Sequence, residues 1–327
     1  MEAASRIALD VMGGDRAPGI NLDGVAVALA GGLPAERLVL VGDEAVVRAG
    51  LAERGLSGLE VLHAPEVIGM DEKPGVALRA KPRSSIAVAT GAVKQGLVGA
   101  HVSMGNTGAV VGAATVGLKT LEGVRRPGIA ITADLGGRPL TLLDMGANTA
   151  PKPDHLVQYG AMGSVLAREV VGVANPRVAL LNIGEEASKG TEFLREAYDL
   201  LAASGQNFIG NIEGKDLFHG AADVVVTDGF TGNVVLKLME GFAEYLVKLF
   251  GAELAQRGAP WAKEALGTIG RKVDYAEYGG ALLIGVQGVV VIGHGRSDGR
   301  AVANALHFAA RALDADVNRA IVRGLSG

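Results

Sequence analysis

The segment Ala100-His-Val-Ser-Met-Gly-Asn-Thr-Gly-Ala109 decides the fold, because in it an apolar strand passes through Gly and small hydroxyl residues into the start of a helix. At such a turn the first N–H groups and the dipole of the helix point outward at the carboxyl end of the strand, where anions bind. No Gly-Lys-Ser/Thr follows, so the segment is not a Walker loop. A tight turn with capping residues has the same features, and the segment alone does not choose between the two.

Short β-branched or Leu-rich runs alternate with helix-length segments on both sides of this turn. Several runs are apolar at every position, which is typical of strands buried on both faces of a parallel sheet. The alternation predicts an α/β fold in three layers, α/β/α, around a mostly parallel sheet. Strands are expected at 6–12, 38–42, 59–63, 100–104, 129–134, 140–145, 177–183, 208–212 and 223–227. Helices are expected at 43–54, 84–97, 108–119, 154–171, 188–203 and 298–323.

The 327 residues show no Ser/Gly-rich linker, repeat or break in composition, so we predict a single α/β/α domain over 1–327 with one helical insertion. Apolar residues make up 49% of the chain and aromatic residues only 4%, so Ala, Val, Leu and Ile must fill the core. The longest uncharged stretch, 278–295, contains six Gly. It is therefore expected to form two buried strands around a turn rather than a membrane span.

Charge and composition exclude several classes of function. The net charge is −4 and no run of five or six like charges occurs, so the basic surface of a nucleic-acid-binding protein is missing. The absence of Cys excludes a thiolate nucleophile and a disulfide framework, and the six His form no HxxxH pair. We therefore predict no metal and no cofactor. The amino terminus lacks the basic and apolar regions of a signal peptide, which predicts a cytoplasmic protein.

The insertion is the one anomaly of composition, since residues 230–278 carry 7 of the 13 aromatic residues. Apolar residues recur there at helical spacing and Gly258-Ala-Pro260 precedes a second helix, which predicts a helical hairpin at about 231–272. Six Lys/Arg against four Glu give this segment a charge of +2, which suits an anionic lipid surface or an acidic carrier protein. For the first helix, packing on its own sheet or on a second copy is the alternative. The tip from Leu249 to Leu266 is the better membrane anchor.

Three further loops, 143–149, 182–190 and 226–233, place small polar residues after a strand. Because such residues converge at the carboxyl edge of a parallel sheet, a composite crevice is more credible than any single loop. Asp144 and Asp228 have capping of turns or helices as their structural alternative. Lys189 is a cation in a Gly-containing loop that suits a mobile oxyanion, while a solvated surface lysine is equally compatible.

Two other positions combine polar residues with a helix start or a Gly-rich turn. Lys81 and Arg83 precede a helix capped by Ser84, which suits an anion, against the alternative of a plain N-cap. His294 lies between two glycines, where a catalytic and a structural role are both compatible with the sequence.

Ordered blocks recur along nearly the whole chain: Ala8 to Asp15, Lys81 with Ser84-Ser85-Ile86, Ser103 to Ala109, Leu143 to Asn148, Asn182 to Gly190, Gly210 to Gly214, Thr227 to Asn233 and Gly279 to Ser297. Through these blocks the chain resembles the acyl-acyl carrier protein:phosphate acyltransferase family of bacterial phospholipid synthesis, the PlsX family. It departs from the family pattern after Ala281, where a proline is expected, and at Gly128, where alanine is usual.

The resemblance implies transfer of a long acyl chain from the phosphopantetheine thioester of acyl carrier protein to inorganic phosphate, giving an acyl phosphate for phospholipid synthesis. It also implies the fold of the isocitrate and isopropylmalate dehydrogenases and of phosphotransacetylases, and a homodimer lying peripherally on the cytoplasmic face of the membrane. Phosphate is ionised at neutral pH and the leaving thiol has a pKa of about 8.5, so positioning and charge stabilisation suffice without a protein nucleophile.

For this reaction we expect Lys189, Asn106 and His294 to be catalytic. The N–H groups of 105–108 with Ser103, and Lys189 or Arg83, would hold phosphate, and another N–H cluster or His294 would stabilise the tetrahedral oxyanion. The substrate-binding set expected from the loops and the resemblance is Asp10, Arg83, Ser84, Ser103, Gly105, Thr107, Gly108, Asp144, Asn148, Asn182, Asp228, Thr231 and Asn233.

Three rival functions make different demands. A phosphate acetyltransferase or butyryltransferase would use coenzyme A and ignore carrier protein. A nicotinamide-linked decarboxylating dehydrogenase would need a cluster of metal-binding carboxylates, and a membrane scaffold would release no thiol. The sequence leaves open the acyl chain length, the dimer geometry and the donor that contacts the thioester oxygen.

Overall fold

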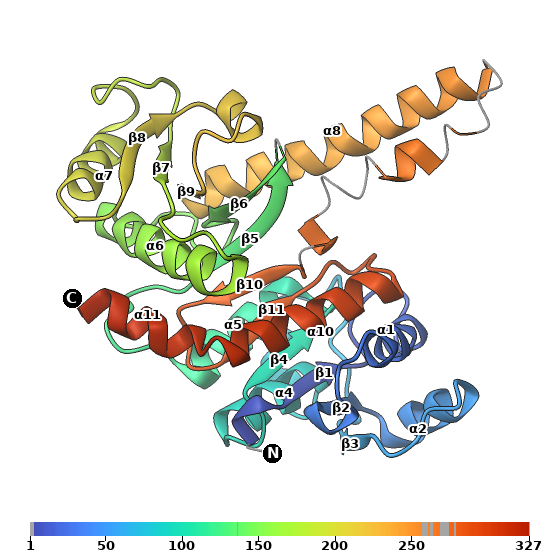
Figure 1. Ribbon diagram of the computed structural model, residues 1–327. Helices are drawn as coiled ribbons and strands as arrows, with labels where there is room; N and C mark the ends of the chain where they lie inside the picture. Colours follow the sequence, from blue (N-terminus) through green and yellow to red (C-terminus); the bar gives the residue numbers. More distant parts are fainter. Residues whose placement is uncertain are drawn as a thin grey trace. The chain divides into compact units, whose positions relative to one another are not determined.

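The computed structural model describes residues 3–135, 137–256, 261, 264–268, 275–277 and 279–326 (Figure 1). The chain divides into two compact units. Unit 1 comprises Met1–Pro127 and Tyr278–Gly327, and unit 2 comprises Gly128–Glu277. The single domain over 1–327 stays a prediction.

Unit 1 contains a sheet that is buried on both faces. Its strand order is β3-β2-β1-β4-β11-β10, with β10 antiparallel to β11 and all other neighbours parallel. Every residue of β1, β2, β4 and β11 is buried, and successive side chains of a strand point to opposite faces, so helices must cover both. The strands are β1 Ile7–Asp10, β2 Leu38–Gly42, β3 Glu60–His63, β4 Ala100–Ser103, β10 Ala281–Ile284 and β11 Val289–Ile292.

The helices of unit 1 pack on these strands in two groups. Helix α10 contacts α1 and the strands β1, β4 and β11, whereas α4 contacts α5 and the strands β1, β2 and β4. Short 3₁₀ helices lie at Ala3–Ser5 and Ala35–Arg37. The α-helices are α1 Gly19–Ala30, α2 Glu44–Glu53, α3 Pro74–Ala80, α4 Ser85–Lys94, α5 Thr107–Leu118, α10 Gly299–Asp314 and α11 Val317–Ser326.

Two features of these helices differ from the expectation. The predicted single helix 298–323 is wrong, because Asp316 has a φ of 47° and divides it into α10 and α11. Helix α1 was not expected, since glycine weakens its helical pattern. Gly24 is nevertheless required there, because a Cβ at this position would lie 2.4 Å from Cβ of Val302 in α10.

The strands of unit 2 follow the order β5-β6-β9-β7-β8, and within the described residues only the β5–β6 pair among them is antiparallel. Its strands are β5 Gly128–Leu135, β6 Arg138–Leu143, β7 Val178–Leu181, β8 Phe208–Ile212 and β9 Val224–Val226. Its helices are α6 Pro153–Leu166 with a π-helical turn at Ala167–Val171, α7 Glu192–Ala202, α8 Gly229–Gln256 and the 3₁₀ helices Gly214–Phe218 and Tyr275–Glu277. The carboxyl ends of β6, β9, β7 and β8 therefore lie along one edge.

The insertion begins with α8, a single helix of 28 residues that Figure 1 shows running well beyond β6. Residues 264–268 are also helical. The buried Leu266 lies against α8, since its Cδ1 is 3.6 Å from where a Cβ on Gly251 would be. The described residues thus contain two packed helical segments, while the predicted turn at 258–260 lies outside them.

The described structure confirms the α/β class and the mostly parallel sheet. All nine expected strands are present, and 278–295 contains two strands, β10 and β11, around a turn. No helix among the described residues is both long enough and apolar enough to span a membrane.

Candidate functional site

In unit 1, three loops meet at the carboxyl ends of β1, β4 and β11. The Gly293 N–H donates to the Ser103 carbonyl at 2.9 Å, and the Asp15 N–H donates to the Gly295 carbonyl at 2.9 Å. These bonds join the loop after β11 to those after β4 and β1. The loops after β1, β4 and β11 therefore converge within unit 1. The convergence of the turn at 103–109 with the loops 143–149, 182–190 and 226–233 stays a prediction.

Asp10 joins two of these loops from inside the protein. It is fully buried, and its Oδ2 accepts a hydrogen bond of 2.7 Å from Ser103 Oγ, which in turn accepts the Gly105 N–H at 3.0 Å. Burial raises the pKa of Asp10, and hydrogen bonds from Ser85 and Ser103 oppose the rise. Asp10, Ser103 and Gly105 are all buried, so the geometry makes them a brace that positions the turn.

The loop after β1 approaches this brace so closely that only glycine fits. A Cβ on Gly13 would lie 2.5 Å from Asp10 Oδ2 and 2.8 Å from the Gly105 nitrogen. Asn21, in α1, fixes the same loop by donating to the carbonyls of Val11 and Gly13, each at 2.8 Å. Asn21 could not be recognised from the sequence, because a single polar residue in a helix carries no signal of its distant partner.

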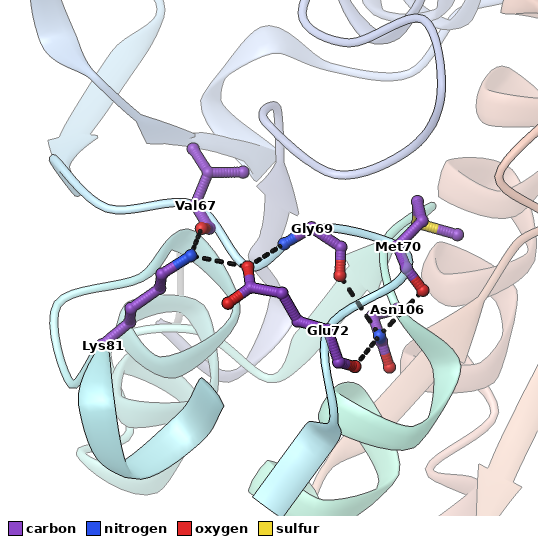
Figure 2. A network of polar contacts seen from close by, with 6 residues as sticks. All are labelled: Val67, Gly69, Met70, Glu72, Lys81 and Asn106. Atoms are coloured by element: carbon purple, nitrogen blue, oxygen red, sulfur yellow. Dashed lines mark hydrogen bonds and ion pairs between the residues drawn. The ribbon is translucent and has the colours of Figure 1, made fainter. Parts of the chain in front are cut away.

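Asn106 caps α5 and holds a second loop (Figure 2). Its Oδ1 accepts the Ala109 N–H at 3.0 Å. Its Nδ2 lies 3.0 to 3.2 Å from the carbonyls of Gly69, Met70 and Glu72. Because both ends of the amide are engaged by the protein, the geometry gives Asn106 a positioning role. Its catalytic role stays a prediction.

Lys81 belongs to the same network and is not a free cation. Figure 2 shows its ammonium between the Val67 carbonyl at 2.7 Å and the Glu72 carboxylate at 2.5 Å. The hydrogen bond from Lys81 lowers the pKa of Glu72. The interpretation of Lys81 as an anion ligand is therefore corrected, since this charge is already paired.

The solvent-facing part of this site is the first turn of α5. Thr107 and Gly108 are exposed, and their N–H groups precede the first capped one, that of Ala109. They stand at the positive end of the helix dipole. Arg83 is exposed just before α4, next to the buried Ser84, which caps α4 by accepting the Ala87 N–H at 3.4 Å. Two N–H groups and one guanidinium of unit 1 are thus available to an anion.

His294 is half-buried in the loop after β11. Its Nδ1 accepts the Arg296 N–H at 3.1 Å, so a neutral ring carries its proton on Nε2. Arg16 closes the same loop by donating to the Ser297 carbonyl at 2.8 Å. On a neutral ring Nε2 is therefore a hydrogen-bond donor and not an acceptor.

In unit 2, Asp144 organises the loop after β6. The residue is completely buried. Its carboxylate accepts the N–H groups of Ile129, Gly146, Ala147 and Asn148 at 2.7 to 3.0 Å. Burial raises the pKa of its carboxyl group, and these backbone hydrogen bonds oppose the rise. The capping alternative left open by the sequence is what the geometry shows.

Two further residues complete this loop. Asn148 Nδ2 donates to the Tyr159 hydroxyl at 2.8 Å, a partner that no local pattern in the sequence indicates. The Asn148 carbonyl accepts the Gly229 N–H at 2.8 Å, which ties the loop after β6 to the start of α8.

The start of α8 is capped by Asp228, which accepts the Thr231 N–H at 2.9 Å and the Thr231 hydroxyl at 2.7 Å. Asn233 is exposed, and its side chain lies 3.6 Å from where a Cβ on Gly146 would be. Thr231 and Asn233 therefore belong to the same cluster as the loop after β6.

The loop after β7 carries Lys189. Asn182 shapes this loop by donating to the Lys189 carbonyl at 3.2 Å, and the missed Asn211 donates to the Glu186 carbonyl at 2.9 Å. The Lys189 ammonium lies 3.9 Å from the Glu186 carboxylate, and half of its side chain is exposed. The backbone is fixed while the cation reaches into solvent.

The structure thus sorts the expected site residues into two kinds. Arg83, Thr107, Gly108, Lys189 and Asn233 are exposed, and His294, Asn148, Asp228 and Thr231 are half-buried. The buried group, which supports the loops, is Asp10, Ser84, Ser103, Gly105, Asn106, Asp144 and Asn182. Among the described residues, no group of three or more His, Asp or Glu is placed to hold a metal ion.

The sequence matches a known protein family and several curated proteins over nearly its whole length. A family model described as "Fatty acid synthesis protein" matches residues 5–320. A phosphate acyltransferase of Heliobacterium modesticaldum is 47% identical over 331 aligned residues, with 98% of both chains covered. A phosphate acyltransferase of Geobacter sulfurreducens is 46% identical, over 96% of this chain and 92% of that protein.

Solved structures agree at the level of the fold. A phosphotransacetylase from Streptococcus pyogenes matches with a TM-score of 0.62 at 18% identity, over 94% of each chain. A branched-chain phosphotransacylase from Enterococcus faecalis matches with a TM-score of 0.59 at 17% identity, over 94% of this chain and 99% of that one.

Proposed function

This chain belongs to the fatty acid synthesis protein family, and we propose that it is a phosphate acyltransferase acting on a long-chain thioester of acyl carrier protein. Inorganic phosphate is the acceptor, and an acyl phosphate for phospholipid synthesis is the product. The observation that carries the proposal is the exposed first turn of α5, braced by Asp10 and Ser103, in a chain that matches phosphate acyltransferases over nearly its whole length.

Phosphate binds at this turn. The N–H groups of Thr107 and Gly108 donate to its oxygens, and the helix dipole favours its negative charge. Asn106 and the Asp10–Ser103 pair hold the turn in place, so that no binding energy is lost in ordering it. Arg83, in the same unit, is the cation that balances the remaining charge.

The reaction needs no covalent bond to the protein. A phosphate oxygen attacks the thioester carbon, the carbonyl oxygen becomes a tetrahedral oxyanion, and the carbon–sulfur bond breaks as the thiolate leaves. The Nε2–H of His294 donates to the oxyanion, and the proton on Nε2 is set by the bond that Nδ1 accepts from Arg296. The catalytic role of Lys189 stays a prediction from the sequence.

The direct test is thiol release from palmitoyl-acyl carrier protein, with and without inorganic phosphate. We expect release only with phosphate, together with an acyl phosphate that hydroxylamine traps as a hydroxamate. Acetyl-coenzyme A, butyryl-coenzyme A and the nicotinamide cofactors serve as controls for the rival functions. Release that does not depend on phosphate, or turnover confined to coenzyme A thioesters, would overturn the proposal.

The α8 helix bears an apolar stripe that no described part of the chain covers. Six residues at intervals of three or four form it, and each is at least 47% exposed. They are Phe230, Val234, Leu238, Phe242, Tyr245 and Leu249. Lys237 pairs with Glu240 at 2.8 Å beside the stripe.

We infer that the stripe packs on a second copy of the chain and that the hairpin tip contacts the inner face of the cytoplasmic membrane. Phe250 and Trp261, 49% and 62% exposed, are two large aromatic side chains at the tip. The segment's charge of +2 favours anionic lipid. Delivery at the bilayer would spare a long acyl product from exposure to water, which costs about 0.8 kcal/mol per CH₂.

Two double variants on the hairpin separate these contacts. Aspartate at Phe250 and Trp261 should abolish sedimentation with phosphatidylglycerol vesicles and leave the oligomeric state unchanged. Aspartate at Leu238 and Phe242 should give a monomer by light scattering. Each variant is the control for the other, and unchanged vesicle binding by the first would rule out the tip as the anchor.

A further inference from the structure

We propose that a groove between α3, α4 and α5 holds the acyl chain of the substrate. The groove has a volume of about 490 Å³ and lies entirely within unit 1. This inference rests on the proposed function, because it assigns a place to the hydrocarbon of the same thioester.

The groove owes its shape to missing side chains. Five glycines line it: Gly75, Gly91, Gly108, Gly112 and Gly117. A Cβ on Gly91 would have no heavy atom within 4 Å, whereas a Cβ on Gly112 would lie 3.2 Å from Leu78. Glycine within a helix costs about 0.5–1 kcal/mol relative to alanine, so the open space is maintained against helix propensity.

One end of the groove coincides with the phosphate site. Gly108 lines the groove and also belongs to the exposed first turn of α5. Gly117 lines the groove nine residues further along the same helix, which corresponds to about 14 Å. A thioester whose carbonyl lies at the first turn of α5 can therefore extend its chain along this helix.

The chemistry of the lining selects a hydrocarbon. Thr90 is its one uncharged polar side chain, and its hydroxyl is already within 3.2 Å of the buried His101 Nδ1. A peptide in the groove would leave its N–H and C=O groups without partners, whereas a methylene chain has none to satisfy. The charged lining residues are Arg79 and Lys94.

The test is to fill the groove with a larger side chain at one of the glycines that line it. Gly91→Leu places a side chain in open space in the middle of α4, and loss of a helical glycine favours the helix. Each methylene excluded from an apolar site costs about fourfold in affinity, so loss of three should lower kcat/KM for a sixteen-carbon acyl-acyl carrier protein roughly sixtyfold. The four-carbon substrate should be affected less than about threefold, and Gly91→Ala should fall between.

Ala49→Leu, on the exposed surface of α2, is the matched control and should leave both substrates unchanged. Displacement of a fluorescent sixteen-carbon fatty acid gives a readout independent of turnover, and Gly91→Leu should weaken this binding as well. Three results for Gly91→Leu would each overturn the proposal that the groove holds the acyl chain. They are an equal loss of kcat/KM for both chain lengths, unchanged kinetics with the long chain, and a shift in oligomeric state. Absence of phosphate-dependent release by the wild type would instead overturn the proposed function, and the binding readout would still test the groove.

Discussion

Replacement of Asp144 by alanine is expected to lower the free energy of unfolding by about 4 kcal/mol. The carboxylate accepts four backbone N–H groups and the Asn148 side chain, so its removal leaves several donors unpaired, at about 1–3 kcal/mol each before water enters. Urea unfolding followed by circular dichroism measures the loss. Asp144→Asn should be less damaging, because one oxygen remains as an acceptor.

Asp228→Ala is the matched control for this variant. Asp228 caps α8 in the neighbouring loop but accepts only from the N–H and hydroxyl of Thr231 among the described contacts. Loss of an N-cap costs about 1 kcal/mol. If Asp144→Ala is no more destabilising than Asp228→Ala, Asp144 does not organise its loop as described.

Replacement of Lys189 by alanine should lower kcat on a long-chain acyl-acyl carrier protein by a factor of about one hundred to one thousand, with melting unchanged. Loss of one donor to a charge that develops in the transition state typically has this effect. Stability should not change, because the ammonium lies 3.9 Å from Glu186 at the surface, and such pairs contribute about 0–1 kcal/mol.

Lys215→Ala is the control for charge, since Lys215 is also exposed in unit 2 and pairs with Glu213 at 2.9 Å. It should retain wild-type turnover. Lys189→Arg should restore part of the rate, because it keeps the charge but changes its geometry. Wild-type kcat in Lys189→Ala would remove Lys189 from the catalytic set. A rise in KM for phosphate with kcat unchanged would limit the residue to binding.

The framework of the protein could be predicted from local pattern. The strand at 38–42 is apolar at every position, and this pattern needs no knowledge of distant residues to indicate burial on both faces. The segment 100–109 likewise contains its own strand, cap and helix start. Polar residues after several strands then predict converging loops, because parallel strands end at the same edge of a sheet.

The roles of the polar residues depended on partners far away in the sequence. Asp10 and Ser103 are 93 positions apart, and nothing local indicates that their side chains meet in the interior. Lys81 and Arg83 look alike in the sequence, yet Glu72 pairs with Lys81 and leaves Arg83 exposed. The role of the glycines that line the groove could not be predicted from the sequence either, because the groove forms only where α3, α4 and α5 pack together.

The sequence by itself therefore determined the α/β class, the nine strands first expected and the loops that carry polar residues. Tertiary structure decided which of those residues are buried braces and which face solvent, where α10 ends, and where open space remains along α5. The physical reason is that hydrophobic periodicity is a property of neighbouring residues, whereas burial, ion pairing and cavities arise only when segments distant in the chain pack together.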